Sequence, residues 1–376
     1  MKILLVLCEM QDLGGIINHT EHLIHGLKSL GHDVTFINLQ NRVACYNSTT
    51  TSRKTKKGFS TGLQMDQSKG WLFPESSKFP FQSGKWRSFT DAYDLVIWET
   101  PVPRIAFGDE WAAPYDLRVP QMVFLHDGNM VKLYPWFVEV AHKFKKIACV
   151  HPAALGNATH CKLKTAELVL NPQAYLNERM VVPGSIPKLN QVCSFQTFKA
   201  WKRVHEIVGA APKFDATLKL YGGGIEYHYM SGKKRKVQYG TIWDDAIASG
   251  KMQFHTYVDE ETRDSIIKES KILIDASWSR GQNLHGALFN RTMVESIICG
   301  TVPLLREPTM KNNGVFPEST YFTAPHPIKS YDEFADSVNF ATSRSEPVHT
   351  AMVRYGQDIV RRRFDSKIIA QQLLEL

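Results

Sequence analysis

Short apolar runs bounded by polar loops recur along the chain, and each is long enough to form one buried strand. Continuous apolar runs of this length are typical of parallel sheets that helices cover on both faces. The strands expected in the first half are Lys2–Leu7, Val34–Leu39, Leu95–Trp98, Met122–Leu125 and Ile147–Val150. Between the first two, apolar residues recur at helical spacing from Ile16 to Leu30, and Gly31 follows. This order of strand, helix and strand predicts a βαβ unit.

The same alternation starts again after Val181–Pro187, a segment whose prolines and glycine suit a linker between domains. The strands expected in the second half are Gln191–Phe195, Thr217–Tyr221, Met252–His255, Ile272–Asp275 and Thr301–Leu305. We therefore predict an α/β fold of two Rossmann-like, doubly wound domains that face a cleft. The N-terminal domain is expected over 1–185 and the C-terminal domain over 186–355. A terminal helix, 356–376, is expected to pack back on the N-terminal domain.

One βαβ unit, from Lys271 to Leu305, draws attention because a long polar loop separates its first strand from its helix. The helix ends at Gly300, where a left-handed C-cap needs no Cβ. Loops at the carboxyl edge of a parallel sheet are where such sheets bind ligands. Glu295 lies on this helix, and its carboxylate could accept hydrogen bonds from the two hydroxyls of a ribose. An exposed helical glutamate without a ligand is the alternative.

Polar residues also follow strands of the first half. Gly14 and Gly15 come after the first strand, but the dinucleotide fingerprint G-x-G-x-x-G is absent there. The two glycines would let backbone amides approach a diphosphate or sugar at the helix N-terminus, or would simply form a tight turn. His126 and Asp127 follow a later strand, so they are expected at the same sheet edge.

Composition describes an ordinary folded protein with a basic balance. The chain has 376 residues, 43% of them hydrophobic and 22% charged, with a net charge of +8. This charge favours partners that carry phosphate, such as a nucleotide, nucleic acid or a membrane surface. No apolar run approaches the length of a membrane span, and the six cysteines show no paired spacing. A cytoplasmic protein with reduced thiols is expected.

The segment 41–90 is a long polar insertion that carries basic residues and isolated tryptophans. Basic residues with aromatics between them suit contacts to a nucleic-acid backbone and its bases, although a solvated loop would have the same composition. A second basic run follows the strand Thr217–Tyr221. The basic residues of these two clusters, which we expect to contact DNA, are Arg53, Lys54, Lys56, Lys57, Lys233, Lys234, Arg235 and Lys236.

Taken in order, these motifs resemble the retaining GT-B glycosyltransferases, which use nucleotide-sugar donors. The resemblance covers most of the chain. It rests on the glycine pair after strand one, a histidine after a mid-domain strand, a basic loop opening domain two, a Gly-x-Glu, and a final Glu separated from a glycine by four residues. These residues are Gly14, Gly15, His126, Lys199, Lys202, Gly224, Glu226, Glu295 and Gly300. The resemblance implies that the lysines neutralise the donor diphosphate and that Glu295 holds the donor ribose.

Within that group the chain is similar to the DNA α-glucosyltransferases of T-even bacteriophages. The segments that carry the similarity are Phe124–Asp127, Trp201-Lys202, Leu288–Glu295 and Cys299–Pro303. The chain departs from the group's E-x7-E pair, because Ala287 stands at the first acidic position and Asn290 at the alternative one in the phage enzymes. The arginine that partners the motif lysine falls near Thr197, so Lys199 is the candidate for that charge.

The resemblance implies transfer of a sugar from a UDP-sugar, expected to be UDP-glucose, to the hydroxymethyl group of 5-hydroxymethylcytosine in double-stranded DNA, with retention. Asn290 joins the glycines, lysines and Glu226 as an expected donor contact, and His126 and Asp127 are expected to orient and deprotonate the acceptor. No D-x-D pair is present, so no obligatory metal is expected, and the enzyme is expected to act as a monomer. The alternatives are a transferase for surface polysaccharide or lipid-linked glycan, and a non-catalytic binder of nucleotide sugar or DNA.

Overall fold

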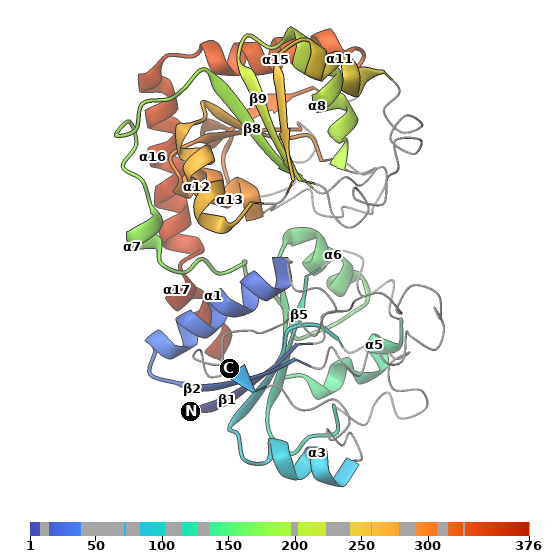
Figure 1. The fold of residues 1–376 in the computed structure, drawn as a ribbon. Coiled ribbons are helices and arrows are strands. Elements are labelled where there is room, and N and C mark those ends of the chain that lie inside the picture. The colour runs from blue at the N-terminus through green and yellow to red at the C-terminus, as the bar shows by residue number, and fades with distance from the viewer. Residues whose placement is uncertain are drawn as a thin grey trace. The chain divides into compact units, whose positions relative to one another are not determined.

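The computed structural model describes most of the chain as two compact units. The described residues are 1–7, 15–38, 71–72, 83–101, 115–126, 135–196, 202–222, 241–256, 258–277, 291–306, 315–325 and 328–375. Unit 1 comprises Met1–Ala174 together with Arg363–Leu376, and unit 2 comprises Tyr175–Arg362 (Figure 1). Unit 2 therefore begins before the boundary expected at residue 185. No described helix combines the length and apolar character needed to cross a bilayer.

Unit 1 contains a parallel sheet of seven strands in the order β3-β2-β1-β4-β5-β6-β7. The strands are β1 (Lys2–Leu7), β2 (Asp33–Asn38), β3 (Trp71–Leu72), β4 (Leu95–Trp98), β5 (Gln121–Leu125), β6 (Lys146–Cys149) and β7 (Ala166–Leu168). The helices are α1 (Gly15–Ser29), α3 (Ser83–Thr90), α5 (Pro135–Val140), α6 (Pro152–His160) and α17 (Ser366–Leu374), with a 3-10 turn η5 (Ala141–Lys143). Helices α1 and α17 cover one face, and α5 and α6 cover the other (Figure 1).

The central strands of this sheet are buried on both faces, which explains their continuous apolar sequences. Residues 3–7 of β1 and 122–125 of β5 are all fully buried. The short edge strands β3 and β7 lack such runs, so their sequences carried no strand signal. The strand order reverses between β1 and β4, since the strands after β1 proceed to one side and those from β4 onward to the other.

Unit 2 contains a parallel sheet of six strands in the order β10-β9-β8-β11-β12-β13. The strands are β8 (Gln191–Gln196), β9 (Thr217–Gly222), β10 (Met252–His255), β11 (Ile272–Asp275), β12 (Val302–Arg306) and β13 (Phe322–Ala324). The helices are α7 (Leu176–Arg179), α8 (Val204–Ala210), α11 (Ile242–Ala248), α12 (Glu260–Glu269), α13 (Arg291–Ile298), α15 (Tyr331–Ser343) and α16 (Glu346–Arg363). Two short 3-10 turns, η7 (Ala211–Lys213) and η8 (Glu318–Thr320), complete the unit. The prediction of two doubly wound α/β halves is confirmed.

At two positions of unit 2 the backbone conformation requires glycine. Gly300 ends α13 with φ of 79°, as expected for a C-cap without a Cβ. Gly222 ends β9 with φ of 144°, and a Cβ there would lie 1.8 Å from the carbonyl oxygen of Gln196. The carboxyl ends of β8 and β9 therefore approach each other more closely than any side chain would allow.

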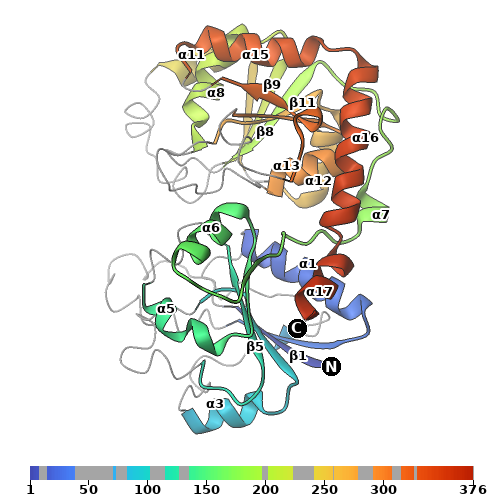
Figure 2. The ribbon, with the colours of Figure 1, turned by 180° about the vertical axis from the view of Figure 1, so that it is seen from behind.

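The last helix of the chain, α17, belongs to unit 1 and packs against α1, as both ribbon views show (Figure 2). The ammonium group of Lys146, in β6, donates to the carbonyl oxygens of Gln372 at 2.9 Å and Glu375 at 2.8 Å. A positive charge on the last carbonyls of a helix also interacts favourably with the helix dipole. The contact with α1 is close, because a Cβ on Gly26 would lie 2.0 Å from the carbonyl oxygen of Ser366.

We predict that Gly26→Ala destabilises unit 1 by separating α1 from α17. Overpacking of this kind costs roughly 1–3 kcal/mol. The matched control is Gly156→Ala in α6, where the new methyl group would meet nothing within 4 Å. Thermal unfolding and amide hydrogen exchange in α17 would measure both variants. Unchanged exchange protection of α17 in Gly26→Ala would contradict the packing described here.

Candidate active site

The carboxyl edge of the unit 1 sheet carries a cluster of three polar side chains where the strand order reverses. Glu99 directly follows β4, and its backbone N–H still donates to the Val6 carbonyl of β1 at 2.8 Å. His126 directly follows β5, and His19 lies on α1. Parallel sheets bind ligands at such reversal points. No sequence motif points to Glu99 or His19, although an acid directly after an apolar strand is a usable signal.

One carboxylate oxygen joins the three residues. Oε2 of Glu99 lies 2.9 Å from Nδ1 of His19 and 3.3 Å from Nε2 of His126. The Glu99 side chain is 0% exposed, whereas that of His126 is 10% exposed. The two imidazole rings meet edge to face, with centroids 4.5 Å apart, and the Phe124 ring packs against both. The rings are therefore held by hydrogen bonds and by packing.

Burial and neighbouring charge determine how the cluster titrates. Burial lowers the pKa of His126, positive charge on His19 lowers it further, and Glu99 acts in the opposite direction. For Glu99, burial alone would raise the pKa, but positive charge on His19 and hydrogen bonds from both histidines lower it to about 2. At neutral pH the cluster combines a buried carboxylate with a neutral His126 ring.

These side chains form the one group of histidine, cysteine and acidic residues in the described part of the chain whose ligand atoms all lie within 4.8 Å of one another. Nitrogen and oxygen donors of this kind suit zinc. The contacts of Oε2 with both ring nitrogens also have ordinary hydrogen-bond lengths, and we treat them as hydrogen bonds. The other carboxylate oxygen, Oε1 of Glu99, and Nε2 of His19 are buried without a hydrogen-bond partner among the described residues. Unsatisfied buried polar atoms are costly and rare outside functional sites.

The neighbouring strand end of unit 1 shows a contrasting role for a histidine. His151 follows β6 and is the N-cap of α6, where its Nδ1 accepts the backbone N–H of Ala154 at 3.1 Å. This residue satisfies an orphan amide of the helix start. Of the two histidines that follow strands, only His126 joins the buried cluster.

The carboxyl edge of the unit 2 sheet has its own polar residues at the reversal between β8 and β11. Gln196 ends β8, is 4% exposed, and neither polar atom of its amide has a hydrogen-bond partner among the described residues. Asp275 ends β11, where Oδ1 accepts the backbone N–H of Ser277 at 2.8 Å and also bonds the Ser277 hydroxyl. A buried amide with an unused donor and acceptor is suited to a ligand that offers both, such as a sugar hydroxyl.

Cations gather at the start of α8 and at the end of β12. Lys202, an expected diphosphate contact, is buried just before α8. Arg203 has a left-handed φ of 53° and donates to Glu206 at 2.6 Å. Arg306 ends β12, pairs with Glu206 and donates to the Pro325 carbonyl at 3.0 Å. Burial and the charge of Arg203 lower the pKa of Arg306 to about 9. This concentration of positive charge suits an anionic ligand.

Glu295 is buried in an ion-pair network and is 2% exposed. Its Oε1 lies 2.5 Å from Nε of Arg291 and 3.3 Å from Nη2 of Arg263. Arg263 in turn pairs with Asp264 at 2.8 Å and with the half-exposed Glu260 at 2.9 Å. No sequence motif points to Arg263, whereas the i,i+4 spacing of Arg291 and Glu295 is a visible signal of an ion pair. The role of Glu295 in holding ribose stays a prediction.

Several expected site residues lie outside the described part of the chain, and their roles stay predictions. They are Gly14, Asp127, Lys199, Gly224, Glu226, Asn290, Arg53, Lys54, Lys56, Lys57, Lys233, Lys234, Arg235 and Lys236. Gly15 is the first residue of α1. Of the expected catalytic and donor residues, the structure describes the side chains of His126, Lys202 and Glu295.

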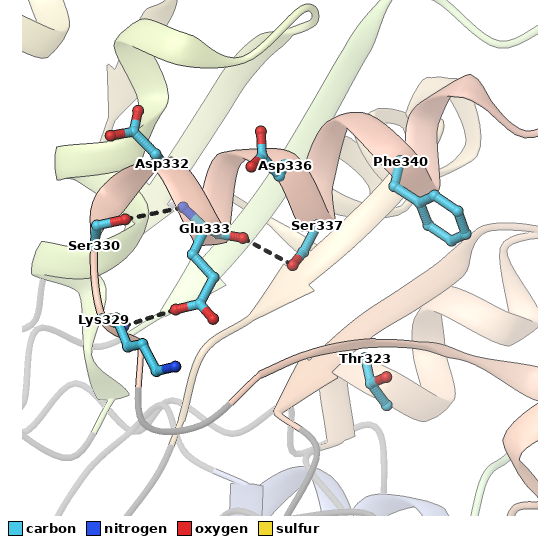
Figure 3. A pocket seen from close by; sticks show the side chains of 8 residues that line it. All are labelled: Thr323, Lys329, Ser330, Asp332, Glu333, Asp336, Ser337 and Phe340. Carbon is cyan, nitrogen blue, oxygen red and sulfur yellow. Dashed lines mark hydrogen bonds between the residues drawn. The ribbon is translucent and has the colours of Figure 1, made fainter.

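A shallow pocket on unit 2 lies over the start of α15 (Figure 3). Its lining includes Asp332, Glu333 and Asp336, which would repel a diphosphate. Ser330 accepts the Glu333 backbone N–H at 3.2 Å, and the Glu333 carboxylate accepts that of Lys329 at 2.7 Å. These hydrogen bonds cap the N-terminus of α15. The pocket therefore surrounds a capped helix start and is not a candidate donor site.

Solved structures match the whole chain despite low sequence identity. An Anabaena HepE structure with UDP and glucose is 15% identical in sequence to this chain, with a TM-score of 0.68. The match covers 100% of this chain and 98% of the HepE chain. An alpha-glucosyltransferase bound to UDP-glucose and DNA with an abasic site is 12% identical, covering 100% and 98%, with a TM-score of 0.71. The fold is GT-B.

A sucrose-phosphate synthase from Thermosynechococcus elongatus also shares this GT-B fold, with 14% identity, coverage of 99% and 97%, and a TM-score of 0.68. No protein-family model and no curated protein sequence matches the chain. The GT-B architecture expected from the sequence motifs is therefore confirmed at the level of fold.

We predict that Glu295→Ala destabilises unit 2, because it leaves two buried arginine contacts without their carboxylate. Removing one partner of a buried ion pair costs roughly 3–5 kcal/mol. Glu260→Ala is the control, since Glu260 contacts the same arginines from a half-exposed position and should cost at most about 1 kcal/mol. Calorimetric unfolding would separate the two variants.

The same pair of variants tests the ribose contact. If Glu295 also holds the donor, UDP affinity measured by titration calorimetry on the folded protein at low temperature should fall for Glu295→Ala and not for Glu260→Ala. Equal UDP affinities in the two variants would restrict Glu295 to a structural role.

Proposed function

We propose that the chain is a UDP-sugar-dependent glycosyltransferase that transfers glucose to the hydroxymethyl group of 5-hydroxymethylcytosine in DNA, with retention. The observation that carries the proposal is the buried Glu99–His126 contact at 3.3 Å, placed where the unit 1 sheet reverses. A neutral histidine held by an ionised carboxylate is a suitable base for a hydroxyl group. The proposed substrate also draws on the alpha-glucosyltransferase of the same fold whose structure contains UDP-glucose and DNA.

Unit 2 supplies the groups proposed to bind the donor. Lys202 at the start of α8 would neutralise the diphosphate, together with Lys199. Arg203 and Arg306, which both pair with Glu206, would add positive potential. As the bond from the sugar to the diphosphate breaks, negative charge grows on the leaving group, and cations fixed nearby stabilise it. The unused amide of Gln196 would bond a sugar hydroxyl, and Glu295 would hold the ribose.

Unit 1 supplies the groups proposed to act on the acceptor. His126, with Asp127, would orient the hydroxymethyl group and accept its proton. The modified base would have to leave the stacked duplex to reach a group at a sheet edge, as in other enzymes that act on bases. The basic clusters at 53–57 and 233–236 would contact the phosphates.

A second candidate is transfer of the sugar to a surface polysaccharide or lipid-linked glycan. It is favoured by structural similarity to the Anabaena HepE structure with UDP and glucose and to a TarM structure with Fondaparinux, alpha-GlcNAc-glycerol and UDP. The donor groups of unit 2 would serve both reactions, so only the acceptor separates the two functions.

Incubation of the protein with UDP-glucose and hydroxymethylated duplex DNA tests the proposal directly. Nucleoside analysis by mass spectrometry should show hexosylated 5-hydroxymethylcytosine, and unmodified duplex should stay unchanged. Transfer to lipid or glycan acceptors, with none to DNA, would replace the proposal by the polysaccharide function. UDP-glucose binding without transfer to any of these acceptors would indicate a binding protein.

We predict that Lys202→Ala lowers kcat by a factor on the order of 10²–10³, because it removes positive charge from the leaving diphosphate. Lys213→Ala is the matched control, since Lys213 is a half-exposed lysine of the same unit that pairs with Asp332. Steady-state kinetics with UDP-glucose would measure both. A Lys202→Ala variant with the kcat of the control would place the diphosphate elsewhere.

We further predict that DNA binding depends steeply on salt. Each phosphate neutralised contributes a slope of about −0.9 in log K against log salt, so four to six contacts lower the affinity by roughly 10²–10³ between 50 and 200 mM. Charge reversal at residues 233–236 should flatten the slope and leave UDP affinity unchanged. Fluorescence anisotropy on a labelled hydroxymethylated duplex measures the slope, and a flat response would argue against DNA as the acceptor.

A further inference from the structure

The hydrogen bonds of the Glu99 cluster determine where the protons of both histidines lie. An ionised carboxylate can only accept hydrogen bonds, so each ring nitrogen that contacts Oε2 must carry a hydrogen. Nδ1 of His19 therefore donates at 2.9 Å and Nε2 of His126 donates at 3.3 Å. In a neutral imidazole the other nitrogen then holds the lone pair. For His126 this nitrogen is Nδ1, which becomes the only ring atom able to accept a proton.

We propose that Glu99 is the positioning residue of His126: it fixes the Nε2–H tautomer, holds the ring, and stabilises the imidazolium that forms when Nδ1 takes the proton of the acceptor hydroxyl. His19 is the second positioning residue, because it shares the same carboxylate oxygen and packs against the His126 ring. This inference rests on the proposed function, since it takes His126 as the base. Nothing in the sequence motifs singles out either positioning residue.

The electrostatics of the cluster support this assignment. Glu99 is fully buried, and its Oε1 has no hydrogen-bond donor among the described residues, so the negative charge on that oxygen is not compensated by any described donor. Protonation of His126 would supply the missing positive charge 3.3 Å away, without any rearrangement. A dry, prearranged charge of this kind stabilises charge that develops during a reaction. In the described part of the chain, Glu99 and His19 are the charged groups that act on His126.

The proposed step is balanced in atoms and charge. The O–H bond of the acceptor breaks and its proton moves to Nδ1 of His126. The acceptor oxygen forms a bond to the anomeric carbon on the same face that UDP leaves, so the configuration is retained, while the bond from that carbon to the UDP oxygen breaks and UDP leaves with the electron pair. The imidazolium later returns its proton to solvent, and no other reactant is needed.

The first test compares Glu99→Gln with Glu167→Gln, a carboxylate-to-amide change at an exposed residue of the same unit that pairs with Lys146. A glutamine can donate to Nε2 and so allow the wrong tautomer. Glu99→Gln should lower kcat by a factor on the order of 10²–10⁴ and leave the KM for UDP-glucose within about twofold. The control should keep the activity of the parent protein. A Glu99→Gln variant that binds UDP normally and retains its kcat would overturn the inference.

The pH dependence gives a readout that a merely structural role would not change. Glu99 raises the pKa of His126, so Glu99→Gln should move the acid limb of the kcat/KM profile to lower pH. Positive charge on His19 lowers the same pKa, so His19→Asn, which keeps a donor for Glu99, should move that limb to higher pH. Shifts in the same direction for both variants, or no shift in either, would contradict the proposed positioning.

Nitrogen NMR of ¹⁵N-histidine-labelled protein tests the tautomer without any activity measurement. His126, assigned by comparison with His126→Gln, should show the Nε2–H tautomer in the parent protein and lose it in Glu99→Gln. If the parent protein transfers sugar to no acceptor, the proposed function fails while this measurement still decides the tautomer. A bound divalent metal whose removal abolishes activity, and whose return restores it, would make the cluster a metal centre and overturn the inference.

Discussion

The structure depends on one geometric constraint: parallel strands end together, so the residues that follow neighbouring strands meet at one sheet edge. In unit 1 this constraint brings Glu99 and His126 together, although they follow different strands and are separated by 27 positions. In unit 2 it brings Gln196, Asp275 and Arg306 to one edge. Each sheet is closed on both faces by helices, so these edges are where polar side chains can be buried and still meet a ligand.

Burial of charge distinguishes the two edges. Unit 1 buries one carboxylate against two histidines, an arrangement whose charge can change with a single proton. Unit 2 buries arginines against carboxylates, as in Arg306 with Glu206 and Arg263 with Glu295. These guanidinium groups stay protonated at neutral pH, so this edge provides a fixed field. Proton transfer in one unit and anion binding in the other match the two halves of the proposed reaction.

The burial of Glu295 against arginines is compatible with two roles for this residue. A glutamate that receives two arginines stabilises the packing of α12 and α13, because an unpaired charge in that position would be costly. The carboxylate has two oxygens, and the described contacts of the arginines use Oε1. A structural role and a ligand-binding role are therefore compatible in one side chain, and stability and UDP affinity have to be measured separately to distinguish them.

The sequence alone determined the central strands of both sheets, because runs such as Leu95–Trp98 and Ile272–Asp275 are buried and thus continuously apolar. It also determined the cap at Gly300, since that conformation requires the absence of a Cβ. Edge strands such as β7 were decided by tertiary pairing, because half-exposed segments of three residues carry no periodicity. The His19–Glu99 contact, across 80 positions, was likewise decided only by the tertiary structure. Local patterns report burial, whereas the meeting of distant polar side chains depends on strand order, which no local pattern encodes.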